Sequence, residues 1–337
     1  MKRILVIQTA FLGDVVLTTP LFRALRRRFP EARVDVLVTP AAAPLVEEDP
    51  HLDGVRVYDK HGGEALRAVG ERLRGGYDAI LAPHRSHRTA LLAWLSRAPL
   101  RVGFRDAGLS FLYHRRVHRP RERHEVDRNL ELLRGLGLIP EPADRVLHVG
   151  YTEQEAGEVD GVLREAGVEK GEPLVALAPG SVWPTKRWPA EGFGAVGRAL
   201  ARGGFRVVLL GGPADREVAA RVAGAVGPAA VNAAGRTSLK ALAAWMDRVR
   251  LLVTNDSAPL HVAAARGTPT VAVFGSTTLG LGFGPFQRAS RVVEVPLECR
   301  PCGLHGRKRC PKGHFRCMRD VTPDMVLRAC DALLSAP

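Results

Sequence analysis

Cysteine is scarce over most of this 337-residue chain, because all five cysteines lie between Cys299 and Cys330. That distribution excludes a small secreted scaffold held together by disulfides. No apolar run approaches the roughly 18 residues of a membrane-spanning helix. The apolar start Ile4–Ile7 is interrupted at Gln8, too early for a signal peptide. We therefore expect a cytoplasmic protein.

Aromatic residues are also few, at 6% of the chain, which disfavours the stacking platforms of single-strand nucleic-acid binders. Acidic residues are outnumbered, since 49 lysines and arginines stand against 35 aspartates and glutamates and give a net charge of +14. A positive field of this size attracts nucleic acids, anionic membrane surfaces and phosphorylated substrates alike. No recognised nucleic-acid module appears, so a basic nucleic-acid-binding protein is a distant alternative.

Short β-rich runs alternate with helical patterns along the chain, which is typical of βαβ units and a parallel sheet. In the first half we expect strands at 3–9, 34–38, 55–58 and 79–81, and helices at 15–29 and 89–96. In the second half we expect strands at 174–178, 206–210, 251–254 and 270–274, and helices at 189–202, 214–226, 239–247, 258–265 and 323–334. Thr152 and Glu155 form a capping box at the start of another helix.

Pro140 and Pro142 mark a linker between these two halves. The sequence therefore predicts an α/β fold with two Rossmann-like domains, residues 1–145 and residues 151–320. Residues 321–337 form a C-terminal helix that could pack back on the N-terminal domain. Ligands of open parallel sheets bind beyond the carboxyl ends of the strands, so we expect a cleft where the two sheets face each other.

The first strand-to-helix loop carries Gly13 and Asp14. Glycine allows a tight turn, and a carboxylate at this edge can act as a general base toward an attacking hydroxyl. The alternative is a plain helix cap, a common place for aspartate. The loop lacks the G-x-G-x-x-G pattern, which weakens a nicotinamide interpretation.

A second loop, residues 179–189, combines glycine, hydroxyls and two adjacent cations, which suit phosphate oxygens. Its candidate binding residues are Ser181, Lys186 and Arg187; the alternative is a solvated basic turn. The loop lacks Walker A spacing, so ATP hydrolysis is not expected. In a third loop, Asp215 and Glu217 could bind ribose hydroxyls, although a surface-facing helix start fits equally well.

A fourth loop runs through residues 255–261 and precedes a helix. Free backbone N–H groups and the positive end of the helix dipole make such a start an anion site. The alternative is an ordinary Asx-capped helix. The candidate residues here and in the following turn are Asp256, Ser257, Ala258, His261, Ser276 and Thr277.

Taken together, these loops resemble those of the ADP-heptose:lipopolysaccharide heptosyltransferases, glycosyltransferase family 9. The resemblance runs in order from Met1 to about Val326. It rests on the G-D loop, the P-G-S…T-K-R-W-P loop, the N-D-S-x-P-x-H segment with F-G-S-T, and the cysteine-rich tail. It implies a GT-B architecture, with an acceptor domain followed by a nucleotide-sugar domain, and inverting transfer of heptose to a lipopolysaccharide core hydroxyl. A transferase or epimerase that uses another nucleotide sugar is the alternative.

The resemblance also implies roles for particular residues. Asp14 matches the base, and Lys186 offsets charge on the departing ADP. The implied donor-binding residues are Gly13, Ser181, Arg187, Glu217, Asp256, Ser257, Ala258, His261, Ser276 and Thr277. Ala258 stands where the family often has glycine, and Thr278 leads into a segment that lacks the usual proline, so the donor sugar stays open.

The cysteine-rich tail contains the spacing C-x2-C-x7-C-x6-C. Four thiolates can form a tetrahedral zinc site, here Cys299, Cys302, Cys310 and Cys317, with His305 and His314 as further candidates. Free thiols and a disulfide are the alternatives. Seven basic residues surround these cysteines and suit phosphates of the acceptor or of a membrane face. The expected partners are therefore an ADP-sugar donor, an anionic glycolipid acceptor and a peripheral membrane surface, with no cofactor required for catalysis.

Overall fold

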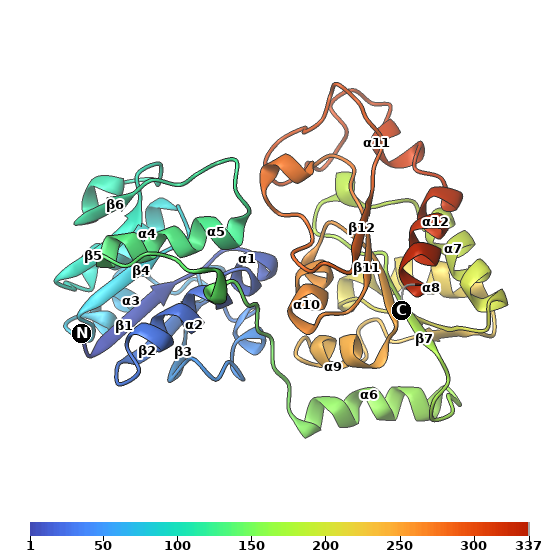
Figure 1. The fold of residues 1–337 in the computed structure, drawn as a ribbon, viewed down its shortest axis with the longest axis horizontal. Coiled ribbons are helices and arrows are strands. Elements are labelled where there is room, and N and C mark those ends of the chain that lie inside the picture. Colours follow the sequence, from blue (N-terminus) through green and yellow to red (C-terminus); the bar gives the residue numbers. More distant parts are fainter. Residues whose placement is uncertain (336–337) are drawn as a thin grey trace. The chain divides into compact units, whose positions relative to one another are not determined.

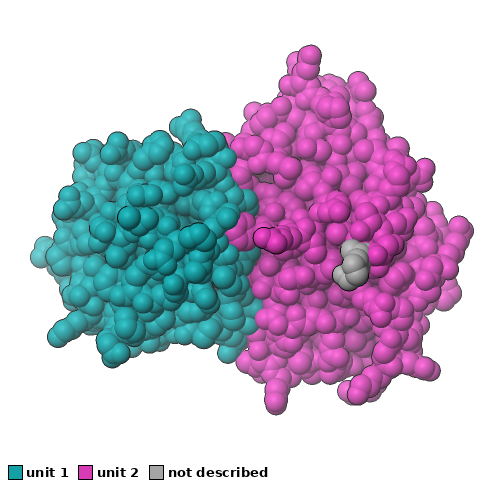
Figure 2. All heavy atoms as spheres, in the orientation of Figure 1, with its two compact units in different colours: residues 1–150 teal, residues 151–337 magenta. Residues whose placement is uncertain are grey.

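The computed structural model describes residues 1–335, and the chain divides into two compact units. Unit 1 comprises residues 1–150 and unit 2 comprises residues 151–337 (Figure 2). Each unit contains one six-stranded sheet in which every strand pair is parallel. Among the described residues, no helix is both long enough and apolar enough to cross a membrane.

The sheet of unit 1 has the strand order β3-β2-β1-β4-β5-β6, and helices cover both of its faces (Figure 1). Its strands are β1 Arg3–Ile7, β2 Arg33–Val38, β3 Gly54–Val57, β4 Ala79–Ala82, β5 Leu100–Phe104 and β6 Arg115–Val117. The inner strands β1 and β4 are apolar almost throughout because both of their faces are buried.

Short helices connect these strands. They are α1 Leu12–Val16, α2 Thr19–Arg28, η1 Ala43–Leu45, α3 Leu66–Leu73, α4 His87–Leu95, η2 Ser110–Leu112, α5 Glu125–Leu130, η3 Glu131–Leu136 and η4 Pro142–Asp144. The single helix predicted over residues 15–29 is wrong, because the chain breaks between α1 and α2. Pro20 has no N–H to donate to Val16, and the Thr19 hydroxyl donates to the Val16 carbonyl at 2.8 Å instead.

The sheet of unit 2 has the order β12-β11-β10-β7-β8-β9. Its strands are β7 Leu174–Ala178, β8 Arg206–Leu209, β9 Ala230–Asn232, β10 Leu251–Asn255, β11 Thr270–Val273 and β12 Ser290–Val293. Its helices are α6 Glu153–Glu165, η5 Pro184–Lys186, α7 Ala190–Arg202, η6 Pro213–Asp215, α8 Arg216–Val226, α9 Ala241–Arg248, α10 Ala258–Arg266, η7 Leu279–Leu281, α11 Arg316–Arg319 and α12 Pro323–Leu334. The capping box of Thr152 and Glu155 at α6 is confirmed.

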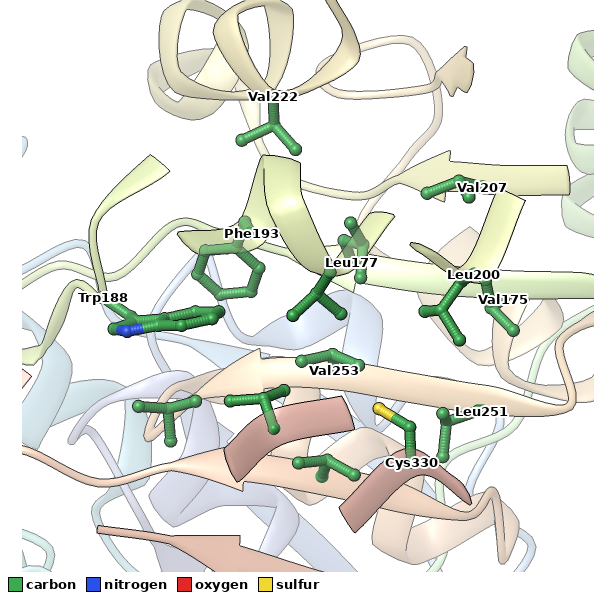
Figure 3. Packing of buried hydrophobic residues seen from close by; sticks show 14 of the residues in the cluster. Val175, Leu177, Trp188, Phe193, Leu200, Val207, Val222, Leu251, Val253 and Cys330 are labelled. Atoms are coloured by element: carbon green, nitrogen blue, oxygen red, sulfur yellow. The ribbon is translucent and has the colours of Figure 1, made fainter. Parts of the chain in front are cut away.

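The core of unit 2 lies between this sheet and helices α7, α8 and α12. Figure 3 shows Trp188 beside Phe193, and their ring centroids are 5.0 Å apart. Val326, Cys330 and Leu333 of α12 are buried in the same cluster, because their spacing places them on one face of that helix.

The C-terminal helix therefore packs within unit 2. The apolar face of α12 is covered by α7 and by strands β10, β11 and β12. The expectation that the segment 321–337 packs back on the N-terminal domain stays a prediction. Residues 336–337 of that segment lie outside the described residues.

Candidate functional site

Three loops of unit 2 meet at the carboxyl edge of its sheet. They follow β7, β10 and β11, which are hydrogen-bonded neighbours in that sheet. Because all three strands are parallel, residues 179–189, 255–257 and 274–278 must leave the sheet side by side. The second and fourth loops singled out in the sequence, with the turn that follows the fourth, thus form one site.

An ion pair lies at the centre of this site. The Nζ atom of Lys186 is 2.6 Å from Oδ2 of Asp256, and the two side chains are only 13% and 5% exposed. The Thr277 hydroxyl donates to the same carboxylate oxygen at 2.6 Å. Each of these three residues comes from a different loop, so their side chains hold the site together. The prediction that these loops converge is correct within unit 2.

Asn255 fixes the geometry of the loop after β7. Its amide nitrogen donates to the Pro179 carbonyl at 2.8 Å, and its amide oxygen accepts from the backbone N–H of Trp188 at 2.9 Å. The fully buried Asn255 side chain thus holds both ends of the loop at residues 179–189. The sequence reasoning missed this role, although an asparagine at the end of an apolar strand was a visible signal.

Arg187, the second cation of this loop, contacts the backbone of the loop itself. Arg187 donates from Nε to the Ser181 carbonyl at 2.7 Å, which closes the turn on itself. Trp188 is buried in the core and donates from its indole nitrogen to the Val321 carbonyl at 3.0 Å. A purely solvated basic turn is therefore excluded for residues 179–189.

The start of α10 lies at the same edge of the sheet. Its N-cap is Ser257, whose side chain makes no capping hydrogen bond, and Pro259 stands in the first turn. Asp256 pairs with Lys186 and does not cap this helix, which argues against the Asx-cap alternative. Ala258 is the first helical residue, and His261 is buried one turn further along. The positive end of the α10 dipole thus lies beside the ion pair.

The turn after β8 touches the same edge through Asp215. A Cβ atom on Gly180 would lie 2.2 Å from Oδ1 of Asp215, so only glycine fits there. The carboxylate accepts from the Gly212 backbone N–H at 3.0 Å. Glu217 is exposed in the first turn of α8, and its contact with the donor stays a prediction.

The cysteine-rich tail packs against two turns of this site. The backbone N–H of Arg307 donates to the Thr185 hydroxyl at 2.7 Å, and that of Cys302 donates to the Ser276 carbonyl at 2.8 Å. Ser276 is itself 1% exposed. The sequence reasoning did not foresee that the tail binds both the 185 turn and the 276 turn.

Arg300 organises the turn after β11. Its guanidinium, whose side chain is 4% exposed, donates to the backbone carbonyls of Thr277 at 2.8 Å and Phe274 at 3.3 Å, and also to that of Gly275. It also pairs with Glu294. This buried cation therefore sets the shape of the F-G-S-T turn.

The five cysteines are free thiols in this structure. Burial, with the neighbouring Cys302 thiol as the next cause, raises the pKa of Cys317 to about 11. Among residues 1–335, no group of three or more histidine, cysteine or acidic side chains is arranged to hold a metal ion. Cys299, Cys302, Cys310 and Cys317 therefore do not form such a group in this structure, and zinc binding there stays a prediction.

In unit 1, Asp14 lies in the first turn of α1, at the carboxyl edge of β1. The N-cap of α1 is Phe11, so Asp14 is not the cap, and its side chain is half-buried. The Thr18 hydroxyl donates to the Asp14 carbonyl at 2.8 Å and fixes this turn. Its role as a base stays a prediction.

Polar groups missed by the sequence reasoning gather at the same edge. Lys60 donates from Nζ to the Thr9 carbonyl at 2.7 Å, and the Thr9 hydroxyl lies 3.1 Å from Nδ1 of His84. Burial and the nearby Arg88 lower the pKa of Lys60. Thr9, Lys60 and His84 follow β1, β3 and β4, so only the sheet order brings them together.

Comparisons with known proteins identify the family of this chain. The model of glycosyltransferase family 9 (heptosyltransferase) matches residues 66–312. Lipopolysaccharide heptosyltransferase 2 of Salmonella typhimurium is 26% identical over 351 residues, 99% of each chain. The crystal structure of a family 9 glycosyl transferase from Veillonella parvula is 30% identical, with a TM-score of 0.85 over 99% of this chain and 97% of that one.

A structure of Escherichia coli ADP-heptose lps heptosyltransferase II has a TM-score of 0.80 at 26% identity, over 99% of this chain and 98% of that one. The predicted α/β fold class, with the two parallel sheets of the GT-B architecture, is confirmed. The family match covers well over half of the chain and includes the loops that build the site. This chain therefore belongs to glycosyltransferase family 9, the heptosyltransferases.

Proposed function

We propose that this enzyme is an inverting heptosyltransferase that moves a heptose from ADP-heptose to a hydroxyl of a lipopolysaccharide core acceptor. The observation that supports this most is the buried Lys186–Asp256 pair beside the start of α10. A sugar diphosphate needs a cation and a helix N-terminus for its phosphates and an acceptor for its hydroxyls. ADP-heptose is proposed as the donor because the name of the Escherichia coli relative includes it.

Donor binding would rearrange this pair. Lys186 turns from Asp256 to a phosphate oxygen, and Asp256 then accepts hydrogen bonds from the sugar hydroxyls. Ser181, Ser257 and Ser276 add hydroxyl donors, Gly13 allows close approach of the backbone, and Ala258 adds a backbone N–H at the start of α10. Because Lys186 is neutralised by Asp256 before the donor binds, the site does not leave an uncompensated buried charge.

The transfer is a single displacement. The acceptor oxygen bonds to the anomeric carbon as the bond from that carbon to the diphosphate oxygen breaks, and the configuration inverts. The hydroxyl proton goes to the Asp14 carboxylate. The electron pair of the broken bond stays on ADP, where Lys186 and the α10 dipole offset its charge. Arg187 and Arg300 act as positioning residues, because they hold the loops that carry these groups.

The acceptor would be anionic. Lys60 and Arg88 supply positive charge at the edge where Asp14 lies, and the whole chain carries a net charge of +14. A lipopolysaccharide-type glycolipid carries phosphates and acidic sugars that suit this edge. We place the enzyme in the cytoplasm, at the inner membrane surface where such an acceptor is presented.

A different nucleotide sugar is the second candidate, because Ala258 and the 278–283 segment depart from the family pattern. Comparing transfer from ADP-heptose with transfer from UDP-linked sugars decides between the two. Faster transfer from a UDP-linked sugar would replace the heptose assignment while leaving the site intact.

The assignment of Asp14 is tested by D14N. This change keeps the size of the side chain and removes its basicity, so transfer should fall by at least about 10²-fold. Binding of ADP, measured by calorimetry, should stay within about twofold because the proposed diphosphate contacts, Lys186 and the start of α10, are unchanged in D14N. Transfer by D14N at the wild-type rate would show that another group removes the proton.

A further inference from the structure

A second charged feature lies at the opposite edge of the unit 1 sheet. It is a pocket of about 420 Å³ formed where α3 and α4 end and β5 and β6 begin. Its lining includes Arg74, Trp94, Arg97, Arg101 and His114. Because the strands are parallel, this amino edge is remote from the carboxyl edge that carries Asp14. The proposed transfer reaction makes no use of it.

The charge of this pocket is one-sided. Three arginines and His114 line it, and no carboxylate does. Burial and the nearby Arg101 lower the pKa of His114, so the arginines carry the charge. On the neighbouring α3 and the segment before it, the arginines are paired, Arg67 with Glu71 and Arg72 with Glu64. Within residues 1–335 no salt bridge involves any of the four basic pocket residues. An anion from outside the chain would supply the missing negative charge.

Arg101 is held ready for such an anion. It donates from Nε to the Leu112 carbonyl at 3.0 Å and from one terminal nitrogen to the Ala98 carbonyl at 2.8 Å. Burial lowers its pKa, and no acidic group offsets this desolvation. Two backbone carbonyls thus orient the guanidinium without neutralising it. An oriented, uncompensated guanidinium is a suitable donor to a phosphate oxygen.

The mouth of the pocket has two further unusual features. Arg97 has a φ of 58°, a left-handed conformation that is costly for a residue with a side chain. Its backbone N–H donates to the Trp94 carbonyl at 3.2 Å, which holds this turn. The Trp94 side chain is 50% exposed, although an indole of this size is usually covered. A cation and an aromatic ring therefore stand together at the entrance.

We propose that this pocket, the amino-edge pocket, binds the phosphate group of an anionic ligand, with Arg101 and Arg97 on the phosphate and Trp94 against the ligand's apolar part. The phosphate belongs either to a lipid headgroup or to a free phosphate compound. Trp94 favours the lipid, because indole rings prefer the boundary between water and acyl chains.

Two arms distinguish the sources. Full-length protein is titrated with inorganic phosphate by calorimetry, and it is sedimented with phosphatidylcholine vesicles that contain or lack phosphatidylglycerol. In whichever experiment shows binding, the variant R101Q should lower the affinity roughly tenfold, as expected for loss of a charge-assisted contact. The control R67Q makes the same charge change on an exposed arginine of α3 and should leave both arms unchanged.

A lipid site gives binding to the phosphatidylglycerol vesicles only, and a free-phosphate site gives a calorimetric signal. If R101Q does not fold, R97Q and W94A are measured in the same way, because both side chains are exposed. Equal losses in R67Q and R101Q, or no binding in either arm, would overturn the proposal. Transfer to a water-soluble acceptor should be unchanged in R101Q, so this test is independent of the proposed function.

Discussion

At the residue scale, the site depends on two buried polar side chains from the loop after β10. Asn255 holds the backbone of the neighbouring loop, and Asp256 holds the amine of Lys186. Each makes contacts that no apolar side chain can replace, and both residues are buried. Substitutions here should therefore change stability as well as chemistry.

Replacing Lys186 with methionine removes the charge and keeps the length of the side chain. Asp256 then stays buried with only the Thr277 hydroxyl, so we expect about 2 kcal/mol lower free energy of unfolding. Transfer should fall about 10²-fold, because a group that offsets leaving-group charge is lost. The control K170M changes an exposed lysine and should alter neither quantity, as checked by urea unfolding and initial rates.

Replacing Asn255 with aspartate separates the two hydrogen bonds of this side chain. An oxygen would then face the Pro179 carbonyl, while the bond from the Trp188 N–H would be kept. The buried repulsion should cost about 2–3 kcal/mol, which corresponds to a decrease in Tm of roughly 4–12 °C for a unit of this size. An unchanged Tm would show that the loop does not depend on this contact.

At the element scale, most helices and strands could be predicted from apolar periodicity. The exceptions are short edge strands and a helix break. The starts of α6 and α12 were predicted from local signals, the capping box at Thr152 and the proline at position 323. The edge strands β9 and β12 were missed because they are three and four residues long and only partly buried. The break between α1 and α2 needed the local effect of Pro20, which the apolar spacing hid.

The same difference holds for the site. Lys186 and Asp256 could be named from residue type and position, but their contact with each other required the order of β7, β10 and β11. Thr9, Lys60 and His84 were missed because each is ordinary by itself. The sequence predicted helix α12, but not the core against which its apolar face packs.

The tail provides a prediction at this scale. Replacing Arg300 with glutamine removes most of the hydrogen bonds that hold residues 274–277. We expect the KM for the donor to rise about tenfold, with a smaller change in kcat, because Arg300 positions the turn and does not touch the reacting atoms. R309Q changes an exposed arginine of the same tail and should leave the KM for the donor unchanged.

Helix α12 gives a pH prediction. Burial raises the pKa of Cys330 from 9.0 to about 12. The unfolded thiol ionises near its ordinary value and the folded one does not, so the stabilisation is complete below pH 9 and decreases as the pH rises toward 12. The free energy of unfolding should thus decrease less steeply over this range in C330A than in the wild type, as measured by urea titrations at each pH. Equal slopes would contradict the burial of this thiol.

At the scale of the whole molecule, the two units have the same kind of sheet and different chemistry at their carboxyl edges. Unit 1 presents Asp14 with Lys60 and His84, while unit 2 presents the Lys186–Asp256 pair and the start of α10. The proposed transfer assigns the base to Asp14 of unit 1 and the diphosphate site to unit 2. It therefore requires that unit 2 binds an ADP-linked donor.

Calorimetric titration of ADP and UDP into the wild type and K186M tests this claim most directly. We expect ADP to bind more tightly than UDP, and K186M to weaken ADP binding at least about tenfold. Equal binding of both nucleotides by the wild type, together with unchanged ADP affinity in K186M, would contradict it.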